Sequence, residues 1–329
     1  MSAERVLVTG TGGPSGYSIL QAMADVEGIE LVSADIDPYS AGLYLVGPDR
    51  RAILPRGDDP GFVEALLALA QRDRVSVIVP TVDSELQPLA AARKRYREAG
   101  IALVLAQAST LAVCLDKWAL HERCRGTVRV PATWLVDATF AVHEVPLPAI
   151  VKPRSGSGSR GIRLVNDPAE LRALRHDGTL LVQEHLPGAE YSLDVLARAD
   201  GHVAAVVPRE RLRIDSGIAI TGRTLRDERL ESYGRAVAQL IGLTTVANVQ
   251  VKLDITGQPA LLEVNPRFPG TMPLTIASGI DMPRLAIGEA LGTAIPDGPL
   301  PFAEIAMVRY FTERFFPFTE IADLQEARR

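Results

Sequence analysis

Short runs of β-branched and other apolar residues alternate with amphipathic stretches over the first hundred residues of the chain. The apolar runs, at residues 5–9, 29–34, 75–80 and 101–105, have the length and composition of buried strands. Between them, residues 17–26, 61–72 and 84–99 place apolar residues at helical spacing. Strands that alternate with helices form βαβ units, so this part is predicted to be an α/β domain with a parallel sheet and right-handed crossovers.

The pattern changes beyond about residue 109. Strand-like runs then follow one another closely, at residues 149–152, 162–165, 180–183, 191–197 and 203–207. Helical patterns occupy residues 116–124 and 225–241, and residues 245–253 and 259–264 are predicted to form a hairpin across a turn at 256–258. Dense strands with few helices between them favour antiparallel sheet. We therefore predict an α/β domain at residues 1–110 and an α+β domain at residues 111–329.

Composition narrows the class of protein. The length of 329 residues suits two domains, and 35 Lys and Arg against 40 Asp and Glu give a net charge of −5, which disfavours nucleic acid as a partner. Two cysteines are too few for a disulfide framework or a four-thiolate zinc site. No apolar run reaches about 18 residues, and the N-terminus has no long apolar segment typical of secretion. We expect a soluble, cytoplasmic enzyme or small-molecule binder with no nucleic-acid or membrane partner.

The first candidate site is the glycine-rich turn at residues 8–16, between the first strand and the first helix. Such a turn brings backbone amides close to a phosphate at the positive end of a helix, and Asp35 lies where an acid that binds ribose would be expected. The dinucleotide fingerprint is imperfect, because Ser15 takes the place of its last glycine and Pro14 stiffens the turn. The alternatives are a nicotinamide-dependent oxidoreductase and a tight turn with no cofactor.

A stronger candidate is the segment at residues 150–162. A strand delivers Lys152, and a Gly/Ser loop follows before the next strand begins. The Lys152 ammonium could contact an α- or β-phosphate, while the loop amides and the hydroxyls of Ser155, Ser157 and Ser159 could surround the terminal phosphates. The alternative is a hairpin loop in which the basic residues are incidental.

Two further strands place oxygen-bearing side chains on one face. Side chains alternate along a strand, so Asn248, Gln250, Lys252 and Asp254 are predicted to share a face. The same period groups Glu263, Asn265 and Arg267 on the neighbouring strand. Carboxylate and amide oxygens suit Mg²⁺ held together with substrate phosphates, and an arginine can bind a carboxylate or phosphoryl group through its planar fork. The alternative is a solvated sheet face.

Two more segments could contact ligands. The strand at residues 181–186 breaks at Pro187 and Gly188, and backbone exposed at such a break could meet an adenine edge, with Glu190 accepting hydrogen bonds from a ribose. The alternative for Glu184 and His185 is a surface pair. Asp83 and Glu85 could reach an ammonium group, although a helix N-terminus explains them equally well.

Together these motifs resemble the ATP-grasp superfamily, and most closely its carboxylate–amine ligases similar to one half of the carbamoyl-phosphate synthetase large subunit. The resemblance covers nearly the whole chain. It implies a Rossmann-like pre-ATP-grasp domain that binds no dinucleotide, followed by a two-subdomain ATP-grasp fold with a small lid at about residues 126–185. It favours the tight turn over the cofactor site at residues 8–16.

The resemblance also implies roles for individual residues. The metal set is Gln250, Glu263 and Asn265, and Arg267 and Lys152 are catalytic. Glu184 and the Leu186 backbone would meet the adenine, and Glu190 the ribose. The full ATP-binding set comprises Lys117, Lys152, Ser155, Gly156, Ser157, Gly158, Ser159, Gly161, Glu184, His185, Leu186, Glu190 and Gln250.

The activity implied is ligation of a small carboxylate to a small amine through an acyl phosphate, with ATP and Mg²⁺, or Mn²⁺ in its place, as cofactors. A homodimer is one assembly that the resemblance suggests, and a non-catalytic ATP-binding protein is the remaining alternative. One departure stands out: the variable wall that faces the acceptor, residues 208–223, is rich in arginine. We expect Arg209, Arg211 and Arg213, with Arg267 and Glu85, to bind substrate, and the arginines suggest that this substrate is anionic. The alternative is that the three arginines protect an exposed sheet edge.

Overall fold

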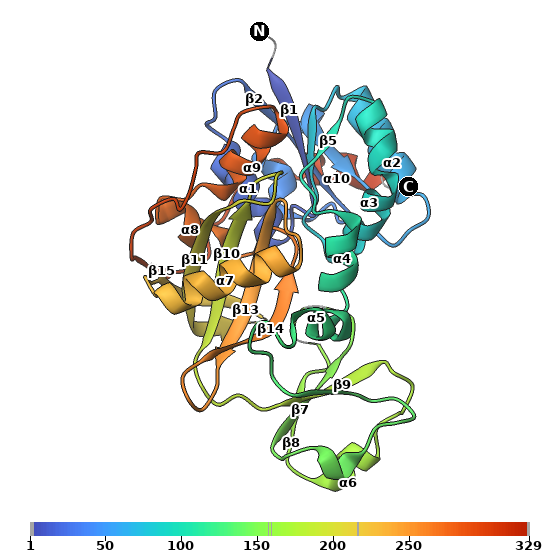
Figure 1. Ribbon diagram of the computed structural model, residues 1–329. Helices are drawn as coiled ribbons and strands as arrows, with labels where there is room; N and C mark the ends of the chain where they lie inside the picture. Colours follow the sequence, from blue (N-terminus) through green and yellow to red (C-terminus); the bar gives the residue numbers. More distant parts are fainter. Residues whose placement is uncertain (1–2, 157, 159, 216, 328–329) are drawn as a thin grey trace.

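The computed structural model describes residues 3–156, 158, 160–215 and 217–327, and its ribbon is shown in Figure 1. Three β-sheets divide the described chain. The predicted combination of an α/β part and an α+β part is confirmed, because the first sheet is parallel and the other two are antiparallel. The predicted domain boundaries near residues 110, 126 and 185 stay predictions. None of the helices in the described ranges is long and apolar enough to cross a membrane.

The N-terminal sheet has five parallel strands in the order β3-β2-β1-β4-β5. The predicted strands and helices are present, although β4 and β5 are shorter than the apolar runs that predicted them. The order places the carboxyl ends of β1, β2 and β4 side by side. The elements are β1 (Glu4–Thr9), α1 (Pro14–Met23), β2 (Ile29–Asp35), β3 (Arg51–Ile53), α2 (Phe62–Arg72), β4 (Val77–Val79), α3 (Asp83–Glu98) and β5 (Ala102–Leu103), with 3-10 turns at Ala41–Leu45 and Pro48–Arg50.

The central sheet has six antiparallel strands in the order β14-β13-β10-β11-β12-β15. Its strands are β10 (Glu190–Ala197), β11 (Val203–Asp215), β12 (Ile218–Thr224), β13 (Val246–Leu253), β14 (Pro259–Asn265) and β15 (Ala306–Val308). Helix α7 (Glu228–Leu240) packs on one face over an apolar core. It begins later than predicted because Asp227 accepts hydrogen bonds from the amides of Arg229 and Leu230. The predicted strand at 203–207 continues to Asp215 and forms the arginine-rich segment with β12.

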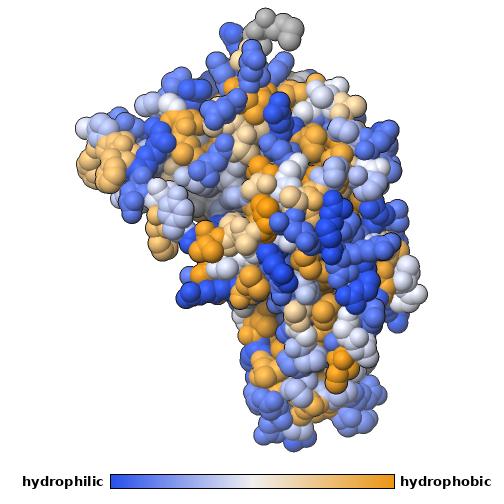
Figure 2. All heavy atoms as spheres, turned by 90° about the vertical axis from the view of Figure 1, so that its left-hand side faces the viewer, coloured by the Kyte–Doolittle hydropathy of each residue, from blue (hydrophilic) through white to orange (hydrophobic). Residues whose placement is uncertain are grey.

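The third sheet forms the small lobe at the bottom of Figure 1, seen from the side in Figure 2 as a narrow extension. Its strands lie in the order β6-β9-β7-β8 and carry their own apolar core, which includes Val136, Val151 and Leu171. The elements are β6 (Thr133–Leu135), β7 (Ala149–Pro153), β8 (Arg163–Val165), α6 (Pro168–Arg172) and β9 (Leu180–Glu184), with a 3-10 turn at Val142–Glu144. We call this lobe the lid.

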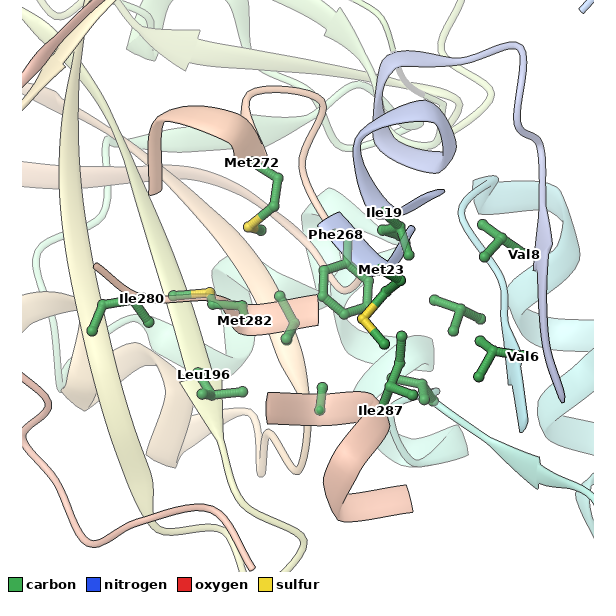
Figure 3. Close-up of a cluster of buried hydrophobic side chains, with 14 of the residues drawn as sticks. Val6, Val8, Ile19, Met23, Leu196, Phe268, Met272, Ile280, Met282 and Ile287 are labelled. Carbon is green, nitrogen blue, oxygen red and sulfur yellow. The ribbon is translucent and has the colours of Figure 1, made fainter. Parts of the chain in front are cut away.

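A shared core joins the N-terminal sheet to the central sheet. Figure 3 shows Ile19 and Met23 of α1 beside Phe268, with Met282 on the other side of Phe268 and Ile287 next to Met23. Phe268 is 2% exposed, so this packing fixes the segment that directly follows β14. The remaining helices are α4 (Ala108–Cys114), α5 (Lys117–Cys124), α8 (Met272–Ala277), α9 (Met282–Ala290) and α10 (Thr319–Ala327).

Candidate active site

One cleft, with a volume of about 1340 Å³, lies where the three sheets meet. Its lining includes the carboxyl ends of β1, β2 and β4, one face of the central sheet, and residues of β7 and β9 in the lid. Ligand sites in open α/β sheets form outside the carboxyl ends of the strands, and this cleft extends such a site onto a second domain. Most of the residues singled out from the sequence line it.

Of the two predicted phosphate-binding lysines, Lys152 lines the cleft, whereas Lys117 does not line it but lies beside Glu263, which does. Lys152, on β7, is 5% exposed, and its Nζ donates to Gln183 Oε1 at 2.8 Å and to the Leu262 carbonyl oxygen at 3.2 Å. Burial lowers the pKa of Lys152 to about 8, with the Glu263 carboxylate acting against this change. Lys117 begins α5, and its Nζ donates to the Gly156 carbonyl oxygen at 2.7 Å and lies 3.8 Å from Glu263 Oε2. Both ammonium groups therefore interact electrostatically with the Glu263 carboxylate.

The Gly/Ser loop joins β7 to β8. Of its described residues, Gly158, Arg160 and Ile162 line the cleft, whereas Ser155, Gly156 and Gly161 do not. Ser157 and Ser159, predicted to bind phosphate, lie outside the described residues. The base of the loop is fixed because Arg154 donates to the Asp116 carboxylate, which also accepts from the first amides of α5. The loop and Lys117 are thus connected before any nucleotide binds.

The predicted oxygen ligands meet on β13 and β14. Gln250 pairs with Glu263 across the two strands, Asn248 pairs with Asn265, and all four residues line the cleft. Asn265 Nδ2 donates to Glu263 Oε1 at 3.1 Å. Asp254 does not share this face, because it lies in the turn after β13, where its carboxylate accepts from Thr256 and Gln258. The prediction that it faces the same side as Gln250 is wrong.

These residues fit Mg²⁺ only in combination with a bound anion. No group of three His, Cys, Asp or Glu side chains in the described part of the chain could hold a metal alone. Glu263 supplies one carboxylate, and Gln250 and Asn265 supply amide oxygens. Mg²⁺ is commonly held by one or two carboxylates together with substrate phosphates, so this donor set suits a nucleotide complex rather than an isolated metal site.

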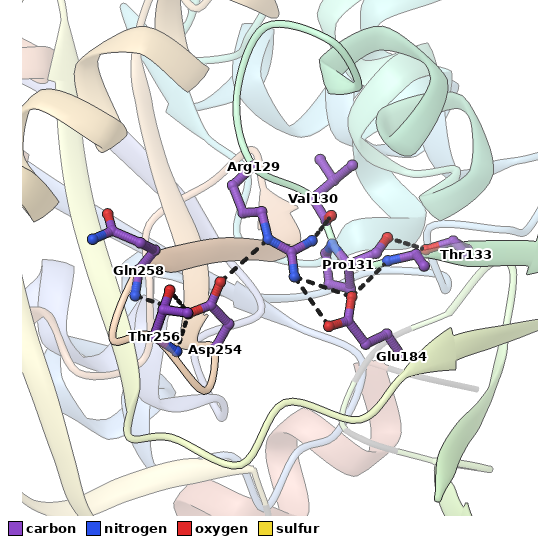
Figure 4. Close-up of polar contacts among 9 residues, drawn as sticks. Arg129, Val130, Pro131, Thr133, Glu184, Asp254, Thr256 and Gln258 are labelled. Atoms are coloured by element: carbon purple, nitrogen blue, oxygen red, sulfur yellow. Dashed lines mark hydrogen bonds and ion pairs between the residues drawn. The ribbon is translucent and has the colours of Figure 1, made fainter. Parts of the chain in front are cut away.

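The residues predicted to meet adenine, Glu184, His185 and Leu186, lie at the end of β9, where the chain passes from the lid to the central sheet. The Glu184 carboxylate accepts from Arg129 Nη2 at 3.0 Å and from the Ala132 amide at 2.9 Å, while Arg129 Nε also donates to Asp254 (Figure 4). This network ties the lid to the β13–β14 hairpin. His185 is half-buried and Leu186 is buried, and both line the cleft.

The three arginines of the predicted acceptor wall have different surroundings. Arg209 is 2% exposed, and its guanidinium donates to the fully buried Asp194 carboxylate at 2.6 and 2.8 Å. Arg211 donates to Glu190 and lies 3.4 Å from Gln250 Oε1, among the residues predicted to bind nucleotide. Arg213 is exposed and lies outside the described lining of the cleft. The segment does not present a uniform basic wall.

Arg267 and Glu85 meet the start of α3. Arg267 donates from Nε to Asp83 Oδ1 at 2.5 Å and from Nη2 to Oδ2 at 3.3 Å, so the end of β14 is joined to the N-terminal sheet. Glu85 is buried and accepts from Thr9 Oγ1 at 2.5 Å and from the Val82 amide at 3.4 Å. Burial raises the pKa of Glu85 to about 7, against these hydrogen bonds. Its side chain therefore caps the N-terminus of α3.

An amide of the glycine turn already has a hydrogen-bond partner within the protein. Asp35 Oδ2 accepts from the Gly12 amide at 2.7 Å, and Oδ1 accepts from the amides of Ile36 and Asp37. Pro14 starts α1, and a Cβ built on Gly270 would lie 2.8 Å from the Pro14 ring. The Gly12 amide is therefore bound by Asp35 rather than left for a phosphate, which favours a tight turn over a nicotinamide site.

Sequence reasoning missed several residues of the site. Asp194 holds Arg209 and also accepts from Asn248 Nδ2 at 2.8 Å, so it supports the strand that carries Gln250. The sequence does contain a signal for Asp194: it is a carboxylate between Leu193 and Val195 in a predicted buried strand, where a charged side chain needs a partner. Ile36 and Tyr39 also line the cleft, and no pattern in the sequence indicated that these two apolar side chains are exposed.

Comparisons with known proteins agree with this geometry. Residues 176–313 match a family model described as ATP-grasp in the biosynthetic pathway with Ter operon, and residues 6–104 match the PylC-like N-terminal domain. The carbamoyl phosphate synthase large chain of Corynebacterium glutamicum is 26% identical over 328 residues, covering 89% of this chain. The match covers only 29% of that protein's own length.

Two further relatives extend the comparison. The D-alanine–D-alanine ligase of Anaeromyxobacter dehalogenans is 32% identical over 177 residues, which cover 48% of this chain and 54% of the ligase. The biotin carboxylase domain dimer of 2-oxoglutarate carboxylase from Hydrogenobacter thermophilus, solved with MgADP, ADP and bicarbonate, has the same fold. Its TM-score is 0.73 at 19% identity, and the match covers 92% of this chain and 73% of that chain.

Proposed function

The chain belongs to the ATP-grasp superfamily, and on that premise we propose that it is an ATP- and Mg²⁺-dependent ligase that couples a small carboxylate to a small amine. The observation that carries the proposal is the convergence in one cleft of Lys152, Glu263, Asn265 and Arg267, with the Lys117 ammonium 3.8 Å from Glu263. Cations, oxygen ligands and a guanidinium at the boundary with a second domain suit phosphoryl transfer from a nucleotide to an acceptor.

The proposed reaction has two steps. A carboxylate oxygen attacks the γ-phosphorus of ATP, the bond from that phosphorus to the β–γ bridging oxygen breaks, and ADP leaves with an acyl phosphate remaining. The amine nitrogen then attacks the acyl carbon, the carbon–oxygen bond to phosphate breaks, and inorganic phosphate leaves as the nitrogen loses a proton. Bound Mg²⁺ supplies positive charge beside the phosphates.

The protein's own residues supply positioning and charge. Lys117 and Lys152 face the phosphates from the side of α5 and the lid, and Arg267 faces the transferred phosphoryl group or the carboxylate. Fixed cations of this kind stabilise charge as it develops and need no reorganisation during the reaction. The loop at residues 155–161 would exclude water from the acyl phosphate.

A non-catalytic ATP-binding protein is the second candidate, and turnover separates it from a ligase. The test is to incubate the protein with ATP, Mg²⁺ and a mixture of carboxylates and amines, and to identify the released nucleotide. We expect ADP and phosphate, and the double variant Glu263→Ala, Asn265→Ala should lose at least a hundredfold in rate. Glu98→Ala, at the exposed end of α3, is the matched control and should keep the wild-type rate.

Release of AMP and pyrophosphate, or an unchanged rate in the double variant, would contradict the proposal.

We also propose that Mn²⁺ can replace Mg²⁺, that the protein is cytoplasmic, and that it forms a homodimer, as the solved biotin carboxylase domain does. Its substrates are small molecules rather than nucleic acids or membranes. Light scattering coupled to size exclusion tests the dimer, and a monomer at micromolar concentration would contradict it.

A further inference from the structure

Large apolar side chains are exposed on the side of the cleft formed by the N-terminal sheet. Ile36, Tyr39 and Val82 are 39%, 61% and 40% exposed, and all three line the cleft. Ile36 and Tyr39 follow β2, and Val82 follows β4, so they come from strands on either side of β1. Exposed apolar side chains are common singly, but a group of them within a cleft marks a binding surface.

The loop that carries Ile36 and Tyr39 is held in place by hydrogen bonds. The Asp35 carboxylate accepts from the amides at 36 and 37, and the buried Tyr44 hydroxyl donates to the Pro38 carbonyl oxygen at 2.5 Å. From the C-terminal helix α10, Gln325 Nε2 donates to the Tyr39 hydroxyl at 2.5 Å. The exposed side chains are therefore presented by a preformed support, as a ligand site requires.

This surface is continuous with the proposed reaction centre. Val82 directly precedes Asp83, whose carboxylate binds Arg267. The glycine turn lies against it on one side, since a Cβ on Gly10 would lie 2.4 Å from Val82 Cγ2. On the other side a Cβ on Gly12 would lie 2.3 Å from Ser40 Oγ, next to Tyr39. The apolar surface thus begins beside Arg267 and continues past the turn to Tyr39.

Charge on the opposite wall does not favour an anionic side group. Arg209 is neutralised by Asp194 and Arg211 by Glu190, so the arginine-rich segment offers little uncompensated positive charge to a substrate. Ile162 and Ile214, each 44% exposed, line the cleft from the lid loop and from β11. The opposite wall therefore also presents apolar side chains to the cleft.

We propose that the surface formed by Ile36, Tyr39 and Val82 binds the side group of the carboxylic acid that is phosphorylated, and that this side group is apolar. The inference rests on the proposed function, because Arg267 would hold the carboxylate at the reaction centre. The side group extends from there over the glycine turn toward Tyr39. The acid is therefore an aliphatic or aromatic one of amino-acid size.

The test uses pairs of acids that have nearly the same shape but differ in polarity: leucine with asparagine, and their deaminated counterparts isocaproate with succinamate. Hydroxylamine traps the acyl phosphate as a hydroxamate, so the natural amine need not be known. We expect kcat/KM for the apolar member to be at least about tenfold higher. Tyr39→Ala and Ile36→Asn should bring that ratio close to one, and Tyr39→Phe, which keeps the ring, should restore most of it.

Matched exposed residues outside the cleft serve as controls. Phe311, 99% exposed, and Ile255, 89% exposed in the β13–β14 turn, are changed to Ala and Asn respectively and should leave the ratio unaltered. A preference for the polar acid, or a ratio that Tyr39→Ala and Ile36→Asn leave unchanged, would overturn the inference.

Calorimetric binding of the same acids in the presence of MgADP separates this inference from the proposed function. One outcome is that isocaproate or leucine binds selectively, that Ile36→Asn abolishes this binding, and that no acid is phosphorylated. This outcome would support the apolar site and contradict the ligase. Phosphorylation of the polar acids alone would support the ligase and overturn the apolar site. Absence of binding by either acid would also overturn it.

Discussion

Lys152 is expected to titrate near physiological pH in the nucleotide-free protein. Its ammonium is buried with two neutral oxygen acceptors, Gln183 Oε1 and the Leu262 carbonyl, and no carboxylate lies within hydrogen-bond distance of it among the described residues. Burial therefore lowers its pKa from 10.5 to about 8. A phosphate in the cleft would supply the missing negative charge, so nucleotide binding should raise the pKa again.

The magnitude follows from the two pKa values. Each unit of pKa difference corresponds to about 1.4 kcal/mol, so keeping Lys152 charged at pH 7 costs the folded protein about 3 kcal/mol. Because the folded pKa is lower, the unfolded chain binds more protons between pH 8 and 10.5, and stability rises with pH there. Linkage gives about 1 kcal/mol of added stability from pH 7 to pH 9. Lys152→Met should remove this increment.

Direct titration is the sharpest assay, because the chain has only four lysines, at positions 94, 117, 152 and 252. NMR of protein with isotope-labelled lysine gives one side-chain signal for each, and the signal missing in Lys152→Met belongs to Lys152. We expect its midpoint near pH 8 without nucleotide and well above that with MgADP. Lys94→Met, at an exposed position on α3, is the control. A midpoint above about 10 without nucleotide would refute the reasoning, since an exposed lysine titrates there.

Three further predictions concern other parts of the cleft. Arg211→Ala should weaken ATP binding by about tenfold or more, which is the loss expected for a charge-assisted hydrogen bond beside Gln250. Arg213 is exposed, so Arg213→Ala should change ATP binding little. Calorimetry measures both, and a larger effect at 213 would contradict the placement of Arg211 near the nucleotide. Glu85 has a raised pKa of about 7, so the folded protein should lose roughly 2 to 3 kcal/mol of stability from pH 5 to pH 8, and Glu85→Gln should abolish that loss in urea unfolding. NADH should leave the intrinsic fluorescence unchanged, because the Gly12 amide already donates to Asp35. Saturable quenching would contradict this.

Local periodicity predicted the strands of the fold well, because buried strands carry their own signal. Residues 5–9 and 29–34 are central parallel strands, and Gln250 and Glu263 face each other across the predicted hairpin. The ends of elements were less predictable. Asp227 delays the start of α7 by a cap, and β11 continues through a polar arginine-rich stretch that propensity alone does not mark as strand.

Partners distant in the sequence could not be predicted from pattern. Arg209, Arg211 and Arg213 alternate along one segment, and their different surroundings depend on Asp194 and Glu190 on the neighbouring strand. Nothing in the spacing distinguishes a buried structural pair from a ligand-binding arginine. The exposure of Tyr39 likewise depends on the loop support from Tyr44 and on a helix nearly 290 residues away, since Tyr39 and Gln325 are separated by 286 positions.

Charge compensation within the cleft gives a physical reason for a dependence on divalent metal. Three of the cations that would face a triphosphate already have carboxylate partners: Lys117 lies near Glu263, Arg211 binds Glu190, and Arg267 binds Asp83. A triphosphate entering the cleft would therefore meet these carboxylates as well as the cations, and the favourable interactions would be offset by repulsion. Added Mg²⁺ would bring positive charge that Glu263 and the phosphates can share. Removal of divalent ions with EDTA should therefore weaken ATP binding itself and not only turnover, and equal ATP affinity with and without Mg²⁺ would contradict this account.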